Sequence, residues 1–118
     1  MTTQENAAPG LVVLWVTADK EAALNMALMY AKNSRLKGWW DEVHLVVWGP
    51  SAKLLATDAK LQAEVAACRK AGVTLLACLA CAKRYGVTDD LKRLGLDVIY
   101  MGEPMTGYLK DGWKVLSV

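Results

Sequence analysis

Two cysteines spaced as Cys-x-x-Cys, Cys78 and Cys81, carry the clearest chemistry in this sequence. A cysteine thiolate attacks disulfide and persulfide sulfurs, and thiols at this spacing can also form a disulfide or bind a metal. Cys78 directly follows the apolar run 73–77, and a helix beginning near Leu79 would place unpaired backbone N–H groups beside its sulfur. We therefore predict a reactive Cys78 at the carboxyl end of a strand, outside the deep core.

Cys81 is open to several interpretations. It can form a dithiol redox pair with Cys78, act as an accessory or resolving thiol beside it, or be a small helix residue without chemistry. A zinc site needs about four ligands, and only Cys68 and His44 remain to complete one. Both are better placed elsewhere, so we expect no metal site.

Cys68 and His44 are predicted to be structural residues. Cys68 follows Leu61 and Val65 at helical spacing, which places it on the buried stripe of its helix. His44 is the only histidine and lies in a strand pattern, without acid or serine spacing typical of a catalytic triad.

Lys83 and Arg84 follow the cysteine pair in the chain. Solvated helix residues are the simpler interpretation of both. If the Arg84 side chain points back toward Cys78, its positive charge lowers the pKa of that thiol and stabilises the thiolate. Arg84 is therefore a candidate site residue.

Apolar and β-branched runs alternate with helical patterns five times along the chain, which predicts a parallel sheet with helices on both faces. In such sheets, functional residues gather where the strands end. The predicted strands are 11–16, 43–48, 73–77, 97–101 and 113–118. The predicted helices are 19–36, 53–70 (in one or two pieces), 79–85, 88–95 and 104–112. The segments that follow the carboxyl ends of predicted strands, and are therefore candidates for a functional site, are 17–19, 49–51, 78–81 and 102–103.

Composition narrows the class of protein. The chain has 118 residues, a length that suits one domain. Its net charge of +2 argues against binding to nucleic acid or to a membrane. Residues 1–10 are predicted to be a disordered lead-in to a single domain over 11–118, and no secretory signal is visible, so the expected compartment is the cytoplasm. Phosphate-binding glycine motifs are missing, and no cofactor is expected.

The segment 78–87, Cys-Leu-Ala-Cys-Ala-Lys-Arg-Tyr-Gly-Val, resembles the central motif of the DsrE/DsrF-like (DsrEFH) sulfur-relay family. The shared features are a strand that feeds a cysteine, an arginine near the end of the short helix, and a Gly-Val pair before a Thr-Asp cap at 88–89. Segments 48–50 and 113–116 extend the resemblance, which covers nearly the whole chain from Leu11.

The resemblance implies a three-layer α/β/α sandwich with a five-stranded, mainly parallel sheet. It implies homo-oligomers, such as trimers or hexamers, and a cysteine that takes up sulfur as a persulfide. Cys78 matches that cysteine, and Cys81 matches an optional second one. Partners would be sulfur donor and acceptor proteins, or small persulfides.

The predicted function is therefore an intracellular sulfur carrier, a sulfurtransferase-type protein that accepts sulfur on Cys78 and passes it to a partner thiol. One alternative is a non-catalytic homo-oligomeric interaction module whose cysteines only pack. Another is a dithiol redox protein that uses Cys78 and Cys81.

The first predicted helix has two apolar stripes, whereas a lone surface helix needs only one. The sheet can cover the first stripe, and a second subunit is the simplest cover for the other. The first stripe is Leu24, Ala27, Leu28 and Ala31; the second is Ala22, Met26, Met29 and Tyr30. We therefore predict that this helix contributes to a subunit interface.

Overall fold

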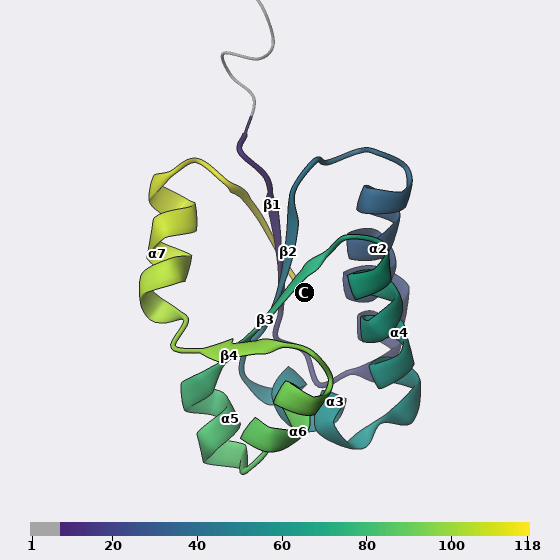
Figure 1. The fold of residues 1–118 in the computed structure, drawn as a ribbon, viewed down its shortest axis with the longest axis vertical. Coiled ribbons are helices and arrows are strands. Elements are labelled where there is room, and N and C mark those ends of the chain that lie inside the picture. Colours follow the sequence, from purple (N-terminus) through teal and green to yellow (C-terminus); the bar gives the residue numbers. More distant parts are fainter. Residues whose placement is uncertain (1–7) are drawn as a thin grey trace, which may run out of the picture.

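The computed structural model describes residues 8–118, so most of the predicted N-terminal lead-in, residues 1–7, lies outside the described residues. The chain forms a five-stranded sheet in the order β4-β3-β2-β1-β5, and every neighbouring pair is parallel (Figure 1). The predicted parallel sheet is confirmed. The strands are β1 (Leu11–Trp15), β2 (Val43–Val47), β3 (Thr74–Cys78), β4 (Asp97–Ile99) and β5 (Lys114–Ser117).

The central strands are buried on both faces, which explains their nearly continuous apolar sequences. The register places Val13 beside Leu45, and Leu45 beside Leu75. Because side chains alternate along a strand, these residues share one face of the sheet, and Val46, Leu76 and Cys78 belong to the other.

The helices form one layer on each face of the sheet. Figure 1 shows α2 and α4 side by side on one face and α7 alone on the other, while α3, α5 and α6 lie toward the carboxyl edge. This arrangement is a three-layer α/β/α sandwich, as predicted. The helical elements are α1 (Lys20–Ala22), η2 (Ala23–Leu28), α2 (Met29–Leu36), α3 (Pro50–Thr57), α4 (Ala59–Lys70), α5 (Leu79–Tyr85), α6 (Thr88–Arg93) and α7 (Gly102–Lys110).

The ends of the helices follow local chemistry. Asp19 and Asp58 each accept a backbone N–H as N-caps, and Asp58 divides the predicted helix 53–70 into α3 and α4. The segment η2 is a π-helix inside the predicted helix 19–36, which the sequence pattern did not indicate. Thr88 is the first residue of α6, and Val87 occupies the capping position expected for Thr88.

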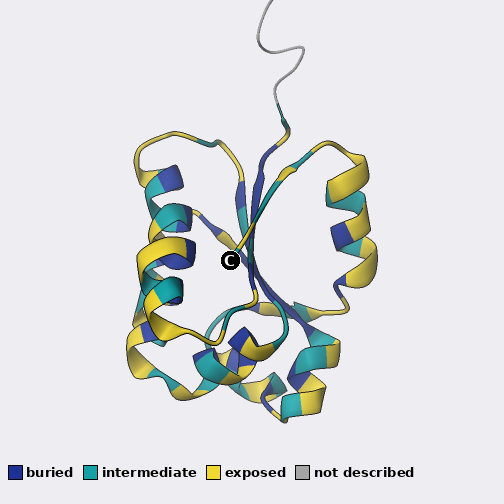
Figure 2. Ribbon diagram, turned by 180° about the vertical axis from the view of Figure 1, so that it is seen from behind, coloured by how far each residue is buried: buried dark blue, intermediate teal, exposed yellow. Residues whose placement is uncertain are grey.

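Two apolar cores occupy the two faces of the sheet. The larger core packs residues of β1, β2 and β3 against α2, α3 and α4. The smaller core lies under α7 and joins Val12, Val46, Leu76, Cys78, Met101 and Met105. Figure 2 shows that the buried surface follows the strands and the inner sides of the helices, whereas the outer sides are exposed.

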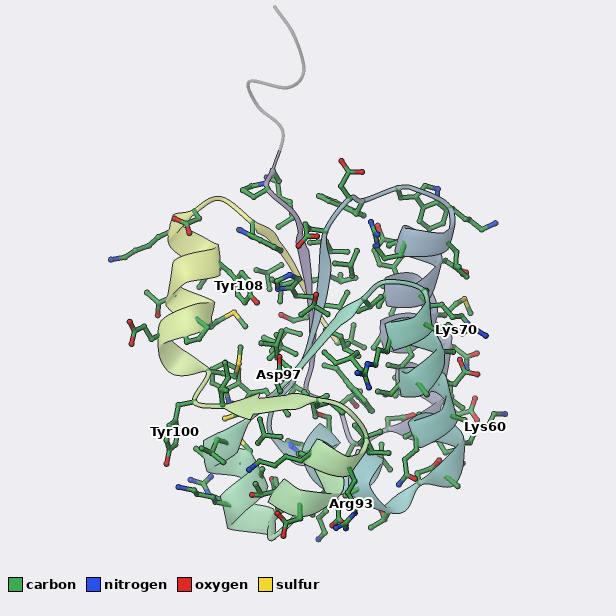
Figure 3. The ribbon with its side chains drawn as sticks, viewed as in Figure 1. Lys60, Lys70, Arg93, Asp97, Tyr100 and Tyr108 are labelled. Atoms are coloured by element: carbon green, nitrogen blue, oxygen red, sulfur yellow. The ribbon has the colours of Figure 1, made fainter. Side chains whose placement is uncertain are left out.

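An aromatic cluster lies between α7 and the sheet where the parallel strands begin, which we call the amino end of the sheet. His44 Nδ1 lies 2.6 Å from the Tyr108 hydroxyl, and the rings of His44 and Trp113 have centroids 4.7 Å apart. Tyr108 reaches from α7 toward the sheet (Figure 3). Trp113 packs so closely on Gly10 that an added Cβ there would lie 2.5 Å from the indole ring, which explains the glycine. His44 is structural, as predicted.

Candidate functional site

Cys78 is the last residue of β3 and the N-cap residue of α5. Its side chain belongs to the smaller core, together with Met101 and Met105, and the residue is only 4% exposed. The expectation that Cys78 lies outside the deep core is therefore wrong. Strand alternation turns it toward the α7 face, where α7 covers it.

Cys81 lies on α5 and is partly exposed, so it is the more accessible thiol of the pair. Its sulfur accepts a hydrogen bond from the backbone N–H of Gly49 at 3.3 Å. Cys81 also packs against the smaller core, to which Cys78 belongs. The structure thus joins the Cys-x-x-Cys pair to the end of β2. Figure 3 shows sulfur atoms gathered where α5, β4 and α7 approach one another.

The turn that follows β2 is held rigidly. Gly49 has φ +74°, in the left-handed region that favours glycine, and Pro50 begins α3 directly behind it. The buried Ser51 hydroxyl donates to the Trp15 carbonyl at 2.6 Å and lies 3.1 Å from the Trp48 carbonyl. These bonds fasten the turn to the end of β1 and fix the direction of the Gly49 N–H.

Several groups act on the Cys81 thiol. Burial is the largest effect and raises its pKa, while the Gly49 N–H and the positive charge of Arg84 oppose the rise. Contact with Cys78 raises the pKa of Cys81 further. At neutral pH, Cys81 therefore rests as a thiol, and Gly49 and Arg84 stabilise the thiolate once it forms.

Arg84 and Lys83 follow Cys81 on α5. The positive charge of Arg84 lowers the pKa of Cys81, and the support of Cys78 by Arg84 stays a prediction. Lys83 donates to the Tyr100 hydroxyl at 2.7 Å and lies 5.1 Å from the centre of that ring. Both cations are exposed, so the surface beside the cysteine pair is positively charged.

Cys68 is a packing residue, as predicted. It is completely buried on α4 with Leu61 and Val65, and its thiol donates to the Leu28 carbonyl at 3.5 Å. Burial raises the pKa of the Cys68 thiol to about 12. The structure therefore separates one inert thiol from the two that share the carboxyl edge.

A surface hollow of about 470 Å³ lies close to the cysteine pair. Pro50, next to Gly49, and Tyr85, one helical turn after Cys81, both belong to its wall. The full lining is Ala18, Pro50, Lys53, Leu54, Thr57 and Tyr85. This hollow is mostly apolar and has one cation, Lys53.

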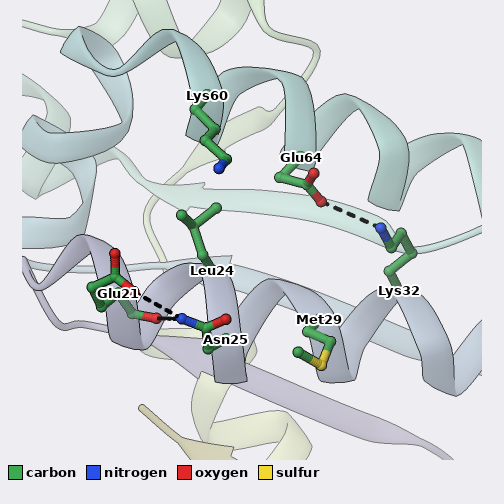
Figure 4. A pocket seen from close by; sticks show the side chains of 7 residues that line it. All are labelled: Glu21, Leu24, Asn25, Met29, Lys32, Lys60 and Glu64. Carbon is green, nitrogen blue, oxygen red and sulfur yellow. Dashed lines mark hydrogen bonds and ion pairs between the residues drawn. The ribbon is translucent and has the colours of Figure 1, made fainter.

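A second hollow, of about 320 Å³, lies between η2 and α4 (Figure 4). It has mixed charge: Lys32 pairs with Glu64 at 3.3 Å, and the Asn25 amide donates to Glu21 at 3.1 Å. Met29 is also in its wall. This hollow contains none of the predicted site residues.

Sequence reasoning identified both cysteines but missed Gly49 and Ser51 as parts of the site. The Gly-Pro-Ser sequence after β2 was the available signal, because parallel strands bring their carboxyl ends to one edge. The hydrogen bond itself depends on the turn geometry, which the sequence does not specify. Within residues 8–118, no three His, Cys, Asp or Glu side chains are arranged to hold a metal ion.

The fold and the site define a class: a three-layer α/β/α protein with a Cys-x-x-Cys pair at the carboxyl edge of its parallel sheet. The sequence profile of the DsrE/DsrF-like family matches residues 12–118, nearly the whole chain. The chain belongs to the DsrE/DsrF-like family, which confirms the resemblance seen in the sequence. No curated protein matches the chain.

Three solved structures are similar to this chain. The conserved protein of unknown function BT1422 from Bacteroides thetaiotaomicron is 40% identical, with a TM-score of 0.90 and complete coverage of both chains. MTH1491 from Methanobacterium thermoautotrophicum, also of unknown function, has 20% identity and a TM-score of 0.73, with 92% of this chain and 98% of that chain covered. The ychN protein from E. coli has 16% identity and a TM-score of 0.71, with coverage of 92% and 97%. The last two similarities concern the fold alone.

Among the described residues, none of the helices is long and apolar enough to cross a bilayer.

Proposed function

We propose that this protein is an intracellular, cytoplasmic sulfur carrier in which Cys78 holds sulfur as a persulfide and passes it to a partner thiol. The observation that carries the proposal is the site itself: a Cys-x-x-Cys pair whose second thiol, Cys81, is hydrogen-bonded to the Gly49 N–H, at the edge where α/β proteins bind their substrates. Membership of the DsrE/DsrF-like family supports a role in sulfur relay.

The proposed reaction exchanges sulfur without net oxidation. The Cys78 thiolate attacks the outer sulfur of a persulfide, R–S–SH; the bond between the two sulfurs of that persulfide breaks, and R–S⁻ leaves. Cys78 then carries the S–SH group. An acceptor thiolate attacks the outer sulfur in turn, which forms the acceptor persulfide and restores the Cys78 thiolate.

The burial of Cys78 suits this role. Persulfides are reactive toward thiols and oxidants, and Met101 and Met105 shield this position from solvent. The donor and acceptor are proteins with reactive cysteines or small persulfides. The positive surface formed by Lys83 and Arg84 favours partners with acidic groups beside the transferred sulfur.

Mass spectrometry of the intact protein after incubation with inorganic polysulfide tests the proposal. We expect one added sulfur, which peptide mapping locates on Cys78 at steady state. A double variant, Cys78→Ala with Cys81→Ser, should gain none, although it keeps Cys68 as an internal control. Absence of added sulfur in the wild-type protein, or its location on Cys68, would contradict the proposal.

The Cys-x-x-Cys spacing, with Cys78 in the smaller core and Cys81 packed against it, also favours a second candidate function, a dithiol redox protein. Such a protein cycles between a Cys78–Cys81 disulfide and two thiols. Equilibration with glutathione buffers measures its reduction potential, and a value in the range of thiol oxidoreductases, about −270 to −120 mV, would support it. A pair that remains reduced throughout would exclude it.

We also propose that the protein is a homo-oligomer, a trimer or hexamer, with the η2–α2 helix in the interface. Met26 and Met29 are 40% and 44% exposed in the single chain, and methionine is common in interface cores. Sedimentation equilibrium should give a mass above the 12.9 kDa of one chain. Met29→Glu places a charge on this surface and should shift the assembly toward smaller species. An unchanged assembly would place the interface elsewhere.

A further inference from the structure

The two thiols of the site differ in their access to solvent, and this difference constrains the path of sulfur. Transfer requires the attacking sulfur to come within about 3–3.5 Å of the donor sulfur, in line with the bond that breaks. Cys78 is 4% exposed and lies beneath Met101 and Met105. A bulky donor cannot approach Cys78 so closely without displacing these side chains, whereas Cys81 is partly exposed.

The second observation is the hydrogen bond at Cys81. The Gly49 N–H points at the Cys81 sulfur from a different strand end, at 3.3 Å. A fixed backbone donor stabilises negative charge on the atom that it faces, and it needs no rearrangement when that charge appears. The sulfur of Cys81 is negative both before its attack on a donor and after it has handed sulfur on.

The third observation is the support of that donor. Ser51 is fully buried, and its hydroxyl bonds to the Trp15 and Trp48 carbonyls while its own N–H bonds to the Val16 carbonyl at 3.1 Å. These bonds hold the turn in which Gly49 adopts its positive φ. All three of these bonds go to backbone carbonyls and none to a thiol, so we expect Ser51 to act on Cys81 through the position of Gly49.

We propose that Cys81 is the thiol that meets the sulfur donor, that the Gly49 N–H stabilises its thiolate, that Ser51 positions Gly49, and that Cys78 receives its sulfur from Cys81. This inference rests on the proposed sulfur-carrier function. It gives sulfur uptake a direction, from the exposed thiol inward to the buried one, and release to a bulky acceptor runs the same exchange in reverse, through Cys81.

The two steps balance. The Cys81 thiolate attacks the outer sulfur of the donor R–S–SH, and R–S⁻ leaves, so Cys81 becomes a persulfide. The Cys78 thiolate then attacks the outer sulfur of the Cys81 persulfide. The bond between the two sulfurs on Cys81 breaks, the Cys81 thiolate is restored under the Gly49 N–H, and Cys78 carries S–SH. The proton of the persulfide travels with the outer sulfur.

The main test compares donors of two sizes in a rapid-quench time course with peptide mapping. With glutathione persulfide as the donor, we expect sulfur on Cys81 first and on Cys78 later. Cys81→Ser should slow the loading of Cys78 by roughly tenfold or more, the size expected when a site loses an oriented reacting group. Cys78→Ala should still load Cys81, and the sulfur should then remain on Cys81. Inorganic polysulfide, being small, should reach Cys78 directly and show a weaker effect of Cys81→Ser.

The outcomes separate this inference from the function on which it rests. If Cys81→Ser loads Cys78 from glutathione persulfide at the wild-type rate, the inward path is wrong although the carrier function stands. If the wild-type protein takes up no sulfur from either donor, the carrier function itself fails.

Ser51→Ala tests the positioning role with a measurement that a loss of stability alone does not change. In the Cys78→Ala background, the alkylation rate of Cys81 by iodoacetamide is followed against pH. Loss of one hydrogen bond to a charged group should lower the rate at pH 7 by roughly tenfold, and the difference from the Cys78→Ala parent should shrink as the pH rises and both thiols ionise. Ser34→Ala is the matched control, because Ser34 is equally buried and its hydroxyl has no partner among residues 8–118.

The control variant should keep the wild-type alkylation profile. An unchanged profile in a folded Ser51→Ala variant would contradict the positioning role. If that variant does not fold, as circular dichroism would show, the donor-size comparison with Cys81→Ser still decides the direction of transfer.

Discussion

The space between α7 and the sheet is filled differently at its two ends. At the amino end of the sheet, the aromatic cluster consists of His44, Tyr108 and Trp113. Their three rings pack on one another, and His44 Nδ1 is hydrogen-bonded to the Tyr108 hydroxyl. At the carboxyl end, Cys78, Met101 and Met105 fill the space with sulfur-containing side chains. One end of the helix is fastened by specific contacts, whereas the other rests on flexible, polarizable groups that adapt to altered volume.

The aromatic cluster therefore contributes to stability, whereas the sulfur-rich end contains the candidate functional site. The paired aromatic end fixes the position of α7, which leaves the sulfur-rich end free to adapt to the added sulfur atom that the proposed function requires. The following predictions test the two ends, and one of them compares Cys78 with Cys68, a buried thiol in the larger core.

The largest expected effect is at the amino end. Trp113→Ala removes an aromatic ring that contacts His44, Tyr108 and Gly10, and large aromatic-to-alanine changes cost about 3–5 kcal/mol of unfolding free energy. Because Trp113 is only partly buried, we expect a cost near the lower value. Urea denaturation measures it. A loss smaller than that caused by Met105→Ala would reverse the comparison.

The second prediction concerns Cys78. Cys78→Ser places a hydroxyl in an apolar cluster and should cost about 1–3 kcal/mol, whereas Cys78→Ala should cost less than Cys78→Ser. Thermal denaturation of both variants measures the difference. Equal stability of Cys78→Ser and wild type would mean that this end is more open to water than its burial indicates.

A related prediction compares Cys78 with Cys68. Both are buried, and Cys68→Ser should also lower the melting temperature, since Cys68 lies in the larger core and its pKa of about 12 reflects strong burial. The two thiols should differ in sulfur uptake: Cys68→Ser should take up sulfur as the wild type does. Reduced uptake in a folded Cys68→Ser variant would bring Cys68 into the pathway.

The smallest effect is the pH dependence at the amino end. Burial raises the pKa of Tyr108 above its ordinary value of 10.0. The neutral phenol is therefore favoured in the folded state, and its contribution to stability is complete below pH 10 and declines as the pH rises further. In Tyr108→Phe, which cannot ionise, the fall in unfolding free energy above pH 10 should be shallower. Identical slopes for variant and wild type would contradict this assignment.

The sequence was sufficient for the strands, the helices and the parallel sheet, although not for the strand order, because the strands are apolar runs and the breaks between them are chemically distinct. Asp19, Gly86 and Pro50 all mark element ends that the structure contains. The π-helical segment η2 was not predictable, because its residues also fit an ordinary α-helical stripe.

The candidate site was predictable only in part. The position of Cys78 after a strand followed from the pattern of apolar residues, but its burial depends on α7, which begins more than twenty residues later in the chain. The support of Cys81 by Gly49 depends on the φ of one glycine and on a serine hydroxyl. Such contacts join segments that are distant in sequence, and no local propensity encodes them.

The order of the strands has a consequence for how the protein folds during synthesis. Leu11 in β1 pairs with Lys114 in β5, so nearly the whole chain separates two neighbouring strands. Closing so long a loop is slow, and one edge of β1 stays unpaired until β5 has been made. The nascent chain therefore exposes a hydrophobic strand edge for most of its synthesis. We expect it to depend on chaperones, and we expect deletion of β5 to yield aggregates instead of a smaller folded domain.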